Sequence, residues 1–273
     1  MILLFDLGGT KLRMALSRDG KRFFAVRIIA SPKTVNGGLK AFQSYLEDNK
    51  IKKLKAVVGS IASSFDRRKS VIVGGGANIK GWLGKPLKQI LGRGLKAPVF
   101  LENDAALAGL GEAMRGAGKG KEIVAYVTVS TGFGGARITR GRIDDSAYGF
   151  EPSYQIAMGG KKYCSRCRDM YLGHHIDGAS LRRHYHKDPK DIKNPKIQND
   201  LAYWLAIALH NAIVFWSPDV IVLGGSVMNI IPLERVRTHL KKFYRHSLPP
   251  IRRAKLGDLG GLWGALAYLK QSK

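Results

Sequence analysis

The sequence is poor in cysteine and in acidic residues. Only two of its 273 residues are cysteine, Cys164 and Cys167, which excludes a disulfide framework of the kind that holds small secreted domains together. Only 20 residues are Asp or Glu against 46 Lys or Arg, so the formal net charge is +26 at pH 7. A reducing compartment follows as the default, and we expect the protein in the cytoplasm.

The sequence also lacks an apolar run long enough to cross a membrane. Residues 2–5 are apolar, but Asp6 interrupts them and no basic segment precedes them, which indicates a buried strand rather than a secretory leader. The longest apolar stretch, residues 201–216, contains His210 and Asn211 and is shorter than the roughly 20 residues that span a bilayer. We expect a core helix there and no membrane association.

Two segments share one plan, in which an apolar strand leads through a glycine-rich turn into an alternating strand. They cover residues 2–16 and 124–140, with turns at 8–10 and 130–135. Because period-2 alternation follows each turn, both segments are predicted to be β-hairpins. Rossmann and P-loop motifs are excluded, since their glycines open a helix. The repeat predicts two related lobes.

Elsewhere, apolar strands alternate with helical patterns. Strands are predicted at 54–58, 99–101 and 220–223, and helices at 38–49, 105–114, 201–216, 233–244 and 260–270. The segments 59–81 and 146–196 appear in the pattern as loop-rich and irregular. This order predicts an α/β fold with a sheet in each lobe and a cleft between them. We expect the lobes to cover 1–102 and 103–273, with the final helix packing back on the N-terminal lobe.

The two glycine turns are candidate phosphate sites. Backbone N–H groups at Gly8 and Gly9 and the hydroxyl of Thr10 are donors suited to phosphate oxygens. Asp6 beside them could hold a hydrated Mg²⁺, an ion that prefers one or two carboxylates plus phosphate oxygens. The turn at 130–135 would supply a matching cradle from the other lobe. Taken singly, each turn could be no more than a tight turn, and Asp6 could simply pair with a Lys such as Lys11. The prediction of phosphate sites therefore rests on the occurrence of the same strand–turn–strand plan twice.

Six segments, in order, resemble motifs of the ROK sugar kinases, a family of the actin-like ATPase superfamily. The matching residues are Asp6, Gly8, Gly9, Thr10 and Lys11 (first phosphate motif), Asn78 and Trp82 (N-x-x-x-W), Asn103, Asp104 and Ala105 (N-D-A), Ser130, Thr131, Gly132 and Gly134 (second phosphate motif), Gly224 and Gly225 (adenosine-side loop), and 257–265 (start of the C-terminal helix). The resemblance covers most of the chain and implies the two-lobed actin-like, ribonuclease H-like fold with a central cleft.

The resemblance also implies an activity that depends on ATP and Mg²⁺. In it, Asp104 accepts a proton from a sugar hydroxyl, usually the one on C6, as that oxygen attacks the γ-phosphorus. Asn78, Asn103 and Glu151 would hold other sugar hydroxyls. A homodimer is common in the family and is expected on that ground alone. Asp104 could also serve only as a helix N-cap, and the Gly224-Gly225 pair only as a packing turn.

The sugar motif departs from the family's G-E-x-G-H pattern. In the sequence Phe150-Glu151-Pro152-Ser153-Tyr154, Glu151 is kept and Tyr154 stands where the histidine belongs. Tyr154 can donate one hydrogen bond but cannot copy an imidazole that also binds zinc. Glucose is therefore not assured as the substrate, and a hexose or an amino sugar is predicted.

The family's zinc knuckle is also altered. Cys164 matches its first cysteine, but Arg166, Tyr171 and Gly173 occupy its other ligand places. Cys164 and Cys167 have acceptable zinc spacing, and the adjacent pair His174-His175 follows, yet neighbouring residues on a helix point about 100° apart. We expect no zinc site and keep the two cysteines as the alternative.

The positive charge raises the question of whether the protein binds a polyanion. Residues 235–255 contain eight Lys or Arg and no acid. A solvated surface explains such a segment, and a polyanion is the alternative, either polyphosphate as phosphoryl donor or nucleic acid bound without sequence preference. No DNA-binding segment is expected before Met1, which disfavours the family's repressor branch. The second functional candidate is a noncatalytic protein that keeps nucleotide and sugar binding.

Overall fold

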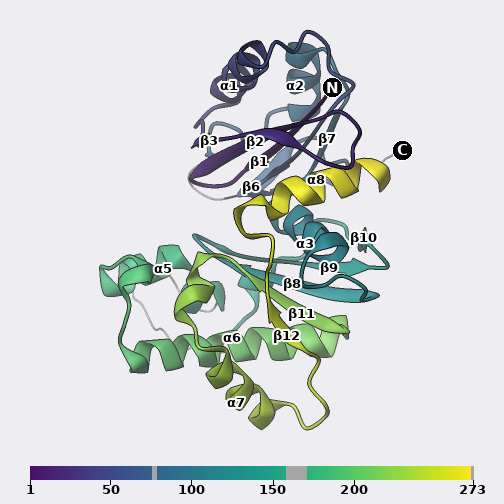
Figure 1. Cartoon of the computed structure of the whole chain (residues 1–273). Coiled ribbons are helices and arrows are strands. Elements are labelled where there is room, and N and C mark those ends of the chain that lie inside the picture. Colours follow the sequence, from purple (N-terminus) through teal and green to yellow (C-terminus); the bar gives the residue numbers. More distant parts are fainter. Residues whose placement is uncertain (76–78, 158–170, 272–273) are drawn as a thin grey trace.

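The computed structural model describes residues 1–75, 79–157 and 171–271 (Figure 1). One sheet contains β1 (Ile2–Leu7), β2 (Lys11–Ser17), β3 (Phe24–Ala30), β4 (Ala56–Ile61) and β7 (Val99–Asn103). The other contains β8 (Ile123–Val129), β9 (Phe133–Thr139), β10 (Arg142–Ile143), β11 (Val220–Gly224) and β12 (Ile251–Arg253). A small separate hairpin is formed by β5 (Ser63–Phe65) and β6 (Ile72–Gly75).

The helices are α1 (Val35–Asp48), α2 (Leu87–Leu95), α3 (Asp104–Arg115), α4 (Gly173–Ile176), α5 (Gly178–Tyr185), α6 (Pro195–Trp216), α7 (Leu233–Phe243) and α8 (Gly260–Gln271). Short 3₁₀ turns include η2 (Pro152–Tyr154), η3 (Pro189–Asp191), η4 (Ser226–Ile230) and η5 (Gly257–Leu259). Figure 1 shows α3 and α8 between the two sheets, with α1 and α2 above one sheet and α6 and α7 below the other.

The two sheets repeat one topology. The first has the order β3-β2-β1-β4-β7 and the second the order β10-β9-β8-β11-β12. In each, an antiparallel meander of three strands is continued by two parallel strands. The prediction of two hairpins with the same plan is therefore confirmed, at β1–β2 and at β8–β9.

The apolar residues of each sheet face two different layers. In β1, Leu3 and Phe5 pack with α1 and α2, while Ile2 and Leu4 face α3 and α8. This alternation follows from the two-residue period of a strand. The cluster around α3 and α8 contains residues of both sheets, so the two lobes share one buried apolar layer.

Glycines let α3 and α8 touch along their backbones. A Cβ added at Gly111 of α3 would overlap the carbonyl oxygen of Gly260, and one added at Gly264 of α8 would overlap the carbonyl oxygen of Leu107. Only residues without a side chain permit such an approach. The distance between the two sheets is therefore set by backbone contact.

A buried carboxylate fixes the segment that leads into α8. Glu112 of α3 is 2% exposed, and its Oε1 accepts hydrogen bonds from the backbone N–H groups of Lys255 (2.8 Å) and Leu256 (2.7 Å). Its Oε2 accepts from the backbone N–H of Ala117 (2.7 Å). The two charge-assisted bonds to Lys255 and Leu256 hold the turn before η5 in one place.

Several elements differ from the sequence-based expectation. The strands β3 and β12 and the helix α2 were not expected, and the segment 59–81 contains the end of β4 and the β5–β6 hairpin. The described part of 146–196, expected to be irregular, contains α4 and α5, and Asp177 caps α5 by accepting a hydrogen bond from the backbone N–H of Ser180. Within the described ranges, no helix is long and apolar enough to cross a bilayer.

The helix contact predicts the effect of adding one methyl group. Gly264→Ala should lower the free energy of unfolding by about 1–3 kcal/mol or more, because the methyl group would push α8 away from α3. Gly92→Ala in α2 is the matched control, since its Cβ would meet its nearest neighbour at 3.5 Å, an ordinary contact. That control should be neutral or gain up to about 1 kcal/mol from helix propensity. Urea unfolding measures both, and equal stability of the two variants would contradict the backbone contact.

Candidate active site

A row of polar side chains crosses the first sheet at the carboxyl ends of its parallel strands. Asp6 of β1 pairs in register with Ser60 of β4, and Ser60 pairs with Glu102 of β7. Register partners share a face of a sheet, and this face carries Leu4 and so looks toward α3 and α8. Open α/β sheets bind their ligands at these strand ends.

Both carboxylate oxygens of Asp6 have protein partners. Ser60 Oγ donates to Oδ1 at 2.6 Å, and Arg13 Nη1 donates to Oδ2 at 3.1 Å. Burial raises the pKa of Asp6 above its usual value, against the opposing effects of Ser60 and Arg13. The sequence left an ion pair between Asp6 and Lys11 as an alternative. In the structure Asp6 pairs with Arg13 instead, and Lys11 contacts Asp258.

Asp258, in η5, forms ion pairs with Lys11 and Arg13, the two basic residues of β2. Its Oδ2 lies 3.4 Å from Lys11 Nζ and 3.1 Å from Arg13 Nη2. Burial acts to raise the pKa of Asp258, but the hydrogen bond and charge of Arg13, with those of Lys11, outweigh it and hold this pKa below its usual value. Arg13 thus bridges Asp6 and Asp258.

The β1–β2 turn is closed by hydrogen bonds to its backbone. Gly8 N–H donates to the carbonyl of Lys11 at 2.9 Å, and Ser31 Oγ donates to the carbonyl of Gly8 at 2.6 Å. Gly9 is half-buried, whereas Thr10 and Lys11 are exposed. The first predicted phosphate loop is a tight hairpin tip beside the Arg13 guanidinium.

Asp104 is the first residue of α3, and Asn103 is its N-cap. Asn103 Oδ1 accepts from the backbone N–H of Ala106 at 3.0 Å, and Asn103 Nδ2 donates to the carbonyl of Ser63 at 3.0 Å. The alternative reading of Asp104 as the cap is therefore wrong by one residue. Asp104 Oδ1 accepts from its neighbour, the Ala105 N–H, at 2.9 Å.

The environment of Asp104 raises its pKa to about 7. Burial is the main cause, and the charges of Asp6 and Glu151 add to it, against the hydrogen bond from the Ala105 N–H. A carboxyl with this pKa is partly protonated at neutral pH and can accept a proton there. The charges of Asp6 and Glu151 both act on Asp104, and we call these three carboxyls the acidic cluster.

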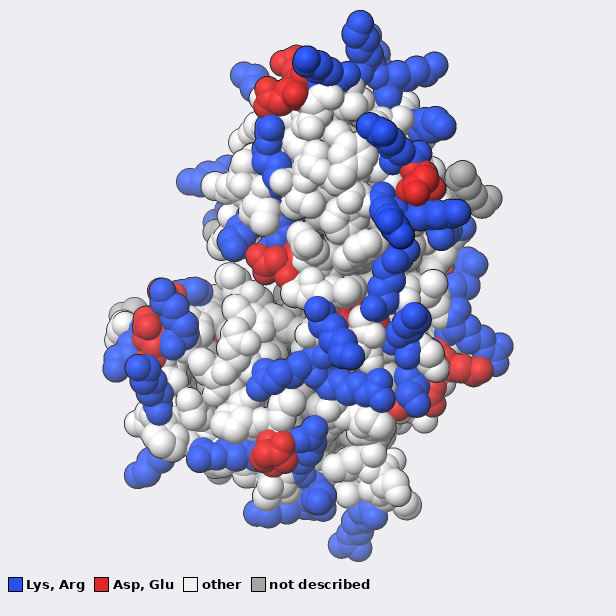
Figure 2. All heavy atoms as spheres, in the orientation of Figure 1, with Lys and Arg blue, Asp and Glu red and all other residues white. Residues whose placement is uncertain are grey.

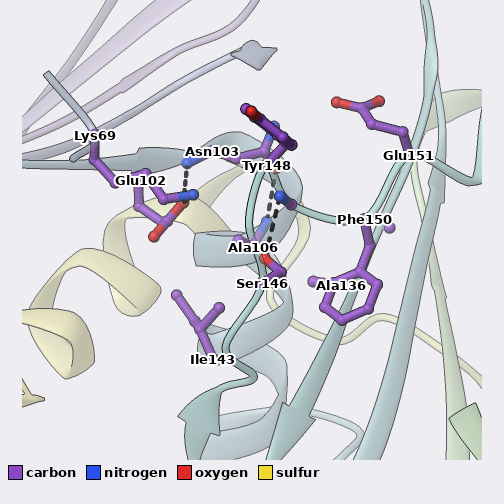
Figure 3. Close-up of a pocket in the computed structure, with 12 residues that line it drawn as sticks. Lys69, Glu102, Asn103, Ala106, Ala136, Ile143, Ser146, Tyr148, Phe150 and Glu151 are labelled. Atoms are coloured by element: carbon purple, nitrogen blue, oxygen red, sulfur yellow. Dashed lines mark hydrogen bonds and ion pairs between the residues drawn. The ribbon is translucent and has the colours of Figure 1, made fainter. Parts of the chain in front are cut away.

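A pocket next to this cluster is lined by residues of both lobes (Figure 3). Lys69 Nζ pairs with Glu102 Oε1 at 2.8 Å on one side, and Glu151 lies on the other, with Tyr148 between them. Glu151 Oε1 accepts from Ser64 Oγ of β5 at 2.6 Å, which joins the two lobes across the pocket. Asn103 lines the pocket as well.

Tyr154 does not line this pocket. It is 62% exposed, and its ring meets Tyr171 edge-on with centroids 5.3 Å apart. Its backbone N–H donates to the carbonyl of Glu151 at 3.1 Å, so its main chain connects it to the other sugar-motif residue.

The second predicted phosphate loop is the tip of the β8–β9 hairpin. Gly132 is exposed, and a Cβ there would meet nothing within 4 Å. The carbonyls of Ser130 and Thr131 accept from the N–H groups of Gly178 (2.7 Å) and Ala179 (3.0 Å) at the start of α5. Gly134 lies against the first turn of α3, where a Cβ would come within 3.2 Å of Ala105.

Gly224 is the last residue of β11, and Gly225 follows it beside that loop. Gly225 has φ +92°, and a Cβ there would overlap the carbonyl of Val129. Close packing therefore requires a glycine at this position. Ser226, which follows, lies with its Oγ 3.5 Å from Ser130 Oγ, so the turn and the β8–β9 tip adjoin.

The remaining predicted site residues are placed apart or not described. Trp82 is fully buried and donates from Nε1 to the carbonyl of Pro32 at 3.0 Å, which makes it a core residue. Asn78, Cys164 and Cys167 lie outside the described residues. Within the described part of the chain, no three His, Cys, Asp or Glu side chains gather as a metal-binding group.

Arg13 and Ser60 are site residues that sequence reasoning missed. Arg13 stands between Leu12 and Met14 in an alternating strand, a pattern typical of a side chain that points to solvent. Its side chain is only 14% exposed, because it lies between Asp6 and Asp258. The sequence does contain one indication of this contact. In a hairpin with the predicted turn, Arg13 lies opposite Asp6 on the preceding strand.

Comparison with known proteins identifies the class. The family model of the ROK family matches residues 3–272, and the chain belongs to this family. The ROK hexokinase from Thermus thermophilus has a TM-score of 0.83 and 29% identity, with 99% of each chain covered. A ROK glucokinase from Streptomyces griseus, in complex with glucose and AMPPNP, has a TM-score of 0.81 and 22% identity over 98% of this chain and 99% of that one.

A curated relative points the same way. The N-acetyl-D-glucosamine kinase of Citrobacter koseri is 26% identical over 96% of each chain. The predicted two-lobed actin-like ATPase fold is confirmed by the likeness to ROK kinase structures.

Figure 2 shows the surface hollowed on one side between the two lobes.

The raised pKa of Asp104 predicts a stability that depends on pH. Because this pKa is about 7 in the folded protein and 3.8 without the fold, the folded state binds more protons between these values and loses stability as the pH rises through them. At pH 8 Asp104→Asn should therefore be more stable than the unaltered protein, by roughly 1–4 kcal/mol, and the gain should shrink toward pH 5.

Asp19→Asn is the control for this prediction. The backbone N–H groups of Lys21 and Arg22 lower the pKa of Asp19, so its removal should give no gain at pH 8. Urea unfolding at pH 5 and pH 8 measures all three proteins. A loss of stability in Asp104→Asn at pH 8 would contradict the assigned environment.

Proposed function

We propose that this protein transfers the terminal phosphoryl group of ATP to a hydroxyl of a hexose or amino sugar. The observation that supports this most is the Asp104 carboxyl, which has a pKa of about 7 and directly follows Asn103, a residue that lines the pocket. The sugar kinases among its ROK relatives supply the reaction class.

In the proposed reaction, Asp104 is the general base. The sugar hydroxyl oxygen forms a bond to the γ-phosphorus, the bond from that phosphorus to the β,γ-bridging oxygen breaks, and ADP leaves with the electron pair. The hydroxyl proton passes to Asp104. Such transfer depends on positioning and electrostatic stabilisation, and general-base help contributes about 10²- to 10⁴-fold.

The acceptor sugar would lie in the pocket next to Asp104. Glu151 has a second carboxylate oxygen beyond the one that accepts from Ser64, and the Asn103 amide keeps one N–H and one lone pair after its bonds to Ser63 and Ala106. These groups can hold sugar hydroxyls. Asn78 and Tyr154 remain predicted sugar contacts.

The nucleotide would lie between the two hairpin tips. The first tip offers Gly8, Gly9, Thr10 and Lys11, the second offers Ser130, Thr131, Gly132 and Gly134, and Gly224 and Gly225 adjoin the second. The open space over Gly132 fits an approaching phosphate chain. ATP, when bound, supplies the phosphoryl group.

A magnesium ion fits this site only through water. Each oxygen of Asp6 already accepts one hydrogen bond, from Ser60 or Arg13, so a metal bound directly would lie next to the Arg13 guanidinium. Each oxygen keeps a free lone pair for a metal-bound water. Asp6 would thus hold a hydrated Mg²⁺ that is also bound by phosphate oxygens.

Removal of the base should abolish most turnover. Asp104→Asn should lower kcat by about 10²- to 10⁴-fold while the KM for sugar changes little, because the amide keeps the shape but accepts no proton. In the unaltered protein, kcat should fall as the pH drops below about 7, where Asp104 becomes protonated. Circular dichroism checks the fold of the variant, and an undiminished rate would refute the assignment.

The second candidate is a noncatalytic nucleotide- and sugar-binding protein. The exposure of Tyr154, which stands in the place of the family's histidine, favours it. A coupled assay over hexoses and amino sugars, with ATP and polyphosphate compared as donors, distinguishes the two. We expect turnover of at least one sugar, and silence across the panel with nucleotide still bound would support the second candidate.

The basic surface suits a polyanion as an additional partner. Figure 2 shows Lys and Arg spread over both lobes, with Asp and Glu in a few places. Polyphosphate as donor, or nucleic acid held without sequence preference, would bind through this charge, and nucleic-acid binding would weaken steeply with added salt. A cytoplasmic location and a homodimer stay predictions.

A further inference from the structure

Lys11 and Arg13 both point at one carboxylate oxygen. Asp258 Oδ2 lies 3.4 Å from Lys11 Nζ and 3.1 Å from Arg13 Nη2. These two cations flank the β1–β2 tip, and a Cβ added at Gly8 would come within 3.9 Å of Arg13 Nη1. The carboxylate of Asp258 therefore occupies a position to which Lys11 and Arg13 would attract an anion.

We propose that Asp258 is an internal competitor for phosphate, and that Arg13 binds the phosphate chain together with Lys11 once Asp258 is displaced. This inference rests on the proposed function and adds two residues to its phosphate site. The ligand chemistry is a chain of phosphates, carried either by a nucleotide or by inorganic polyphosphate.

The contacts of Asp258 are suited to exchange. The Asp258 side chain is 59% exposed and that of Lys11 is 53% exposed, so water screens their ion pair and little is lost when it breaks. The peptide groups before Asp258 stay in place, because Glu112 accepts from the N–H groups of Lys255 and Leu256. The side chain can thus swing away while its backbone remains fixed.

Arg13 is better placed than Lys11 to remain at the site. It is 14% exposed and stays tied to Asp6 through Nη1 at 3.1 Å, and within the described residues its Nε has no hydrogen-bond partner. A planar guanidinium offers several donors in a fixed fork that matches phosphate oxygens. Displacement of Asp258 would free one edge of this fork without loss of the contact to Asp6.

The formal charges of the four ion-paired side chains at the β1–β2 tip cancel before a ligand binds. Lys11 and Arg13 contribute two positive charges, and Asp6 and Asp258 two negative ones. Neutralising Asp258 would leave a net positive charge beside the glycine turn. A phosphate chain would then meet less repulsion and no competitor for the two cations.

The test measures binding rather than turnover. Asp258→Asn should tighten the binding of AMPPNP and of inorganic tripolyphosphate by about three- to tenfold in isothermal titration calorimetry. The gain should shrink at high ionic strength, where exposed charges are screened. Lys11→Met should weaken the binding of both ligands.

Asp48→Asn is the matched control. Asp48 on α1 is also an exposed carboxylate, 54% exposed in its side chain, and it pairs with Arg27 at 2.7 Å. Its substitution changes the net charge by the same amount and should leave both affinities unchanged.

Each outcome decides the proposal. Tightening of both ligands assigns the site to the phosphate chain itself, tightening of AMPPNP alone assigns it to nucleotide phosphates, and tightening of tripolyphosphate alone assigns it to the inorganic chain. Equal affinities in Asp258→Asn and Asp48→Asn, or weaker binding in Asp258→Asn, would overturn the inference and leave the proposed function standing. If the unaltered protein bound neither ligand, the proposed function would fall and this inference with it.

Discussion

The contact between α3 and α8 is the constraint on which the rest of the structure depends. Glycines at Gly111 and Gly264 bring the two helix backbones together between the sheets. The same approach brings the start of α3, with Asp104, to the strand end that carries Asp6. Gly261 leaves room there, since a Cβ at that position would lie 2.8 Å from Asp6 Cγ. The acidic cluster is thus a result of close helix packing, and burial in this packing raises the pKa of both carboxyls.

The architecture could be predicted because its signals are local and repeated. Apolar strands that end in glycine turns and continue in alternation specify the two hairpins, and the small residues of α3 indicate a closely packed helix. Where tertiary contacts override local preference, the prediction failed. α2 contains Gly92 and Gly94, which disfavour a helix, yet a Cβ at Gly94 would lie 2.6 Å from Leu39 on α1. The fold therefore needs the residue that hides the helix from sequence analysis.

The sequence predicts which types of residue form the site, but not which of them contact one another. Asn103 and Asp104 are both favoured N-caps, so the sequence could not tell which of them closes the helix and which keeps a carboxylate available. Strand alternation indicates an exposed Arg13, but the contact with Asp258 depends on a segment almost 250 residues away in the chain. Ion pairs between distant segments leave no periodic signal, and they set the charge around the hairpin tip.

The position of α8 has a consequence for folding during synthesis. This helix covers the face of the first sheet that carries Ile2 and Leu4, although it is the last described element of the chain and those residues are among the first. While the ribosome still holds the segment that forms α8, that apolar face of the sheet lacks its cover. The growing chain must keep a hydrophobic surface accessible to chaperones or to other nascent chains until α8 emerges, so the speed at which the segment up to α8 is translated bears on how the first sheet avoids aggregation.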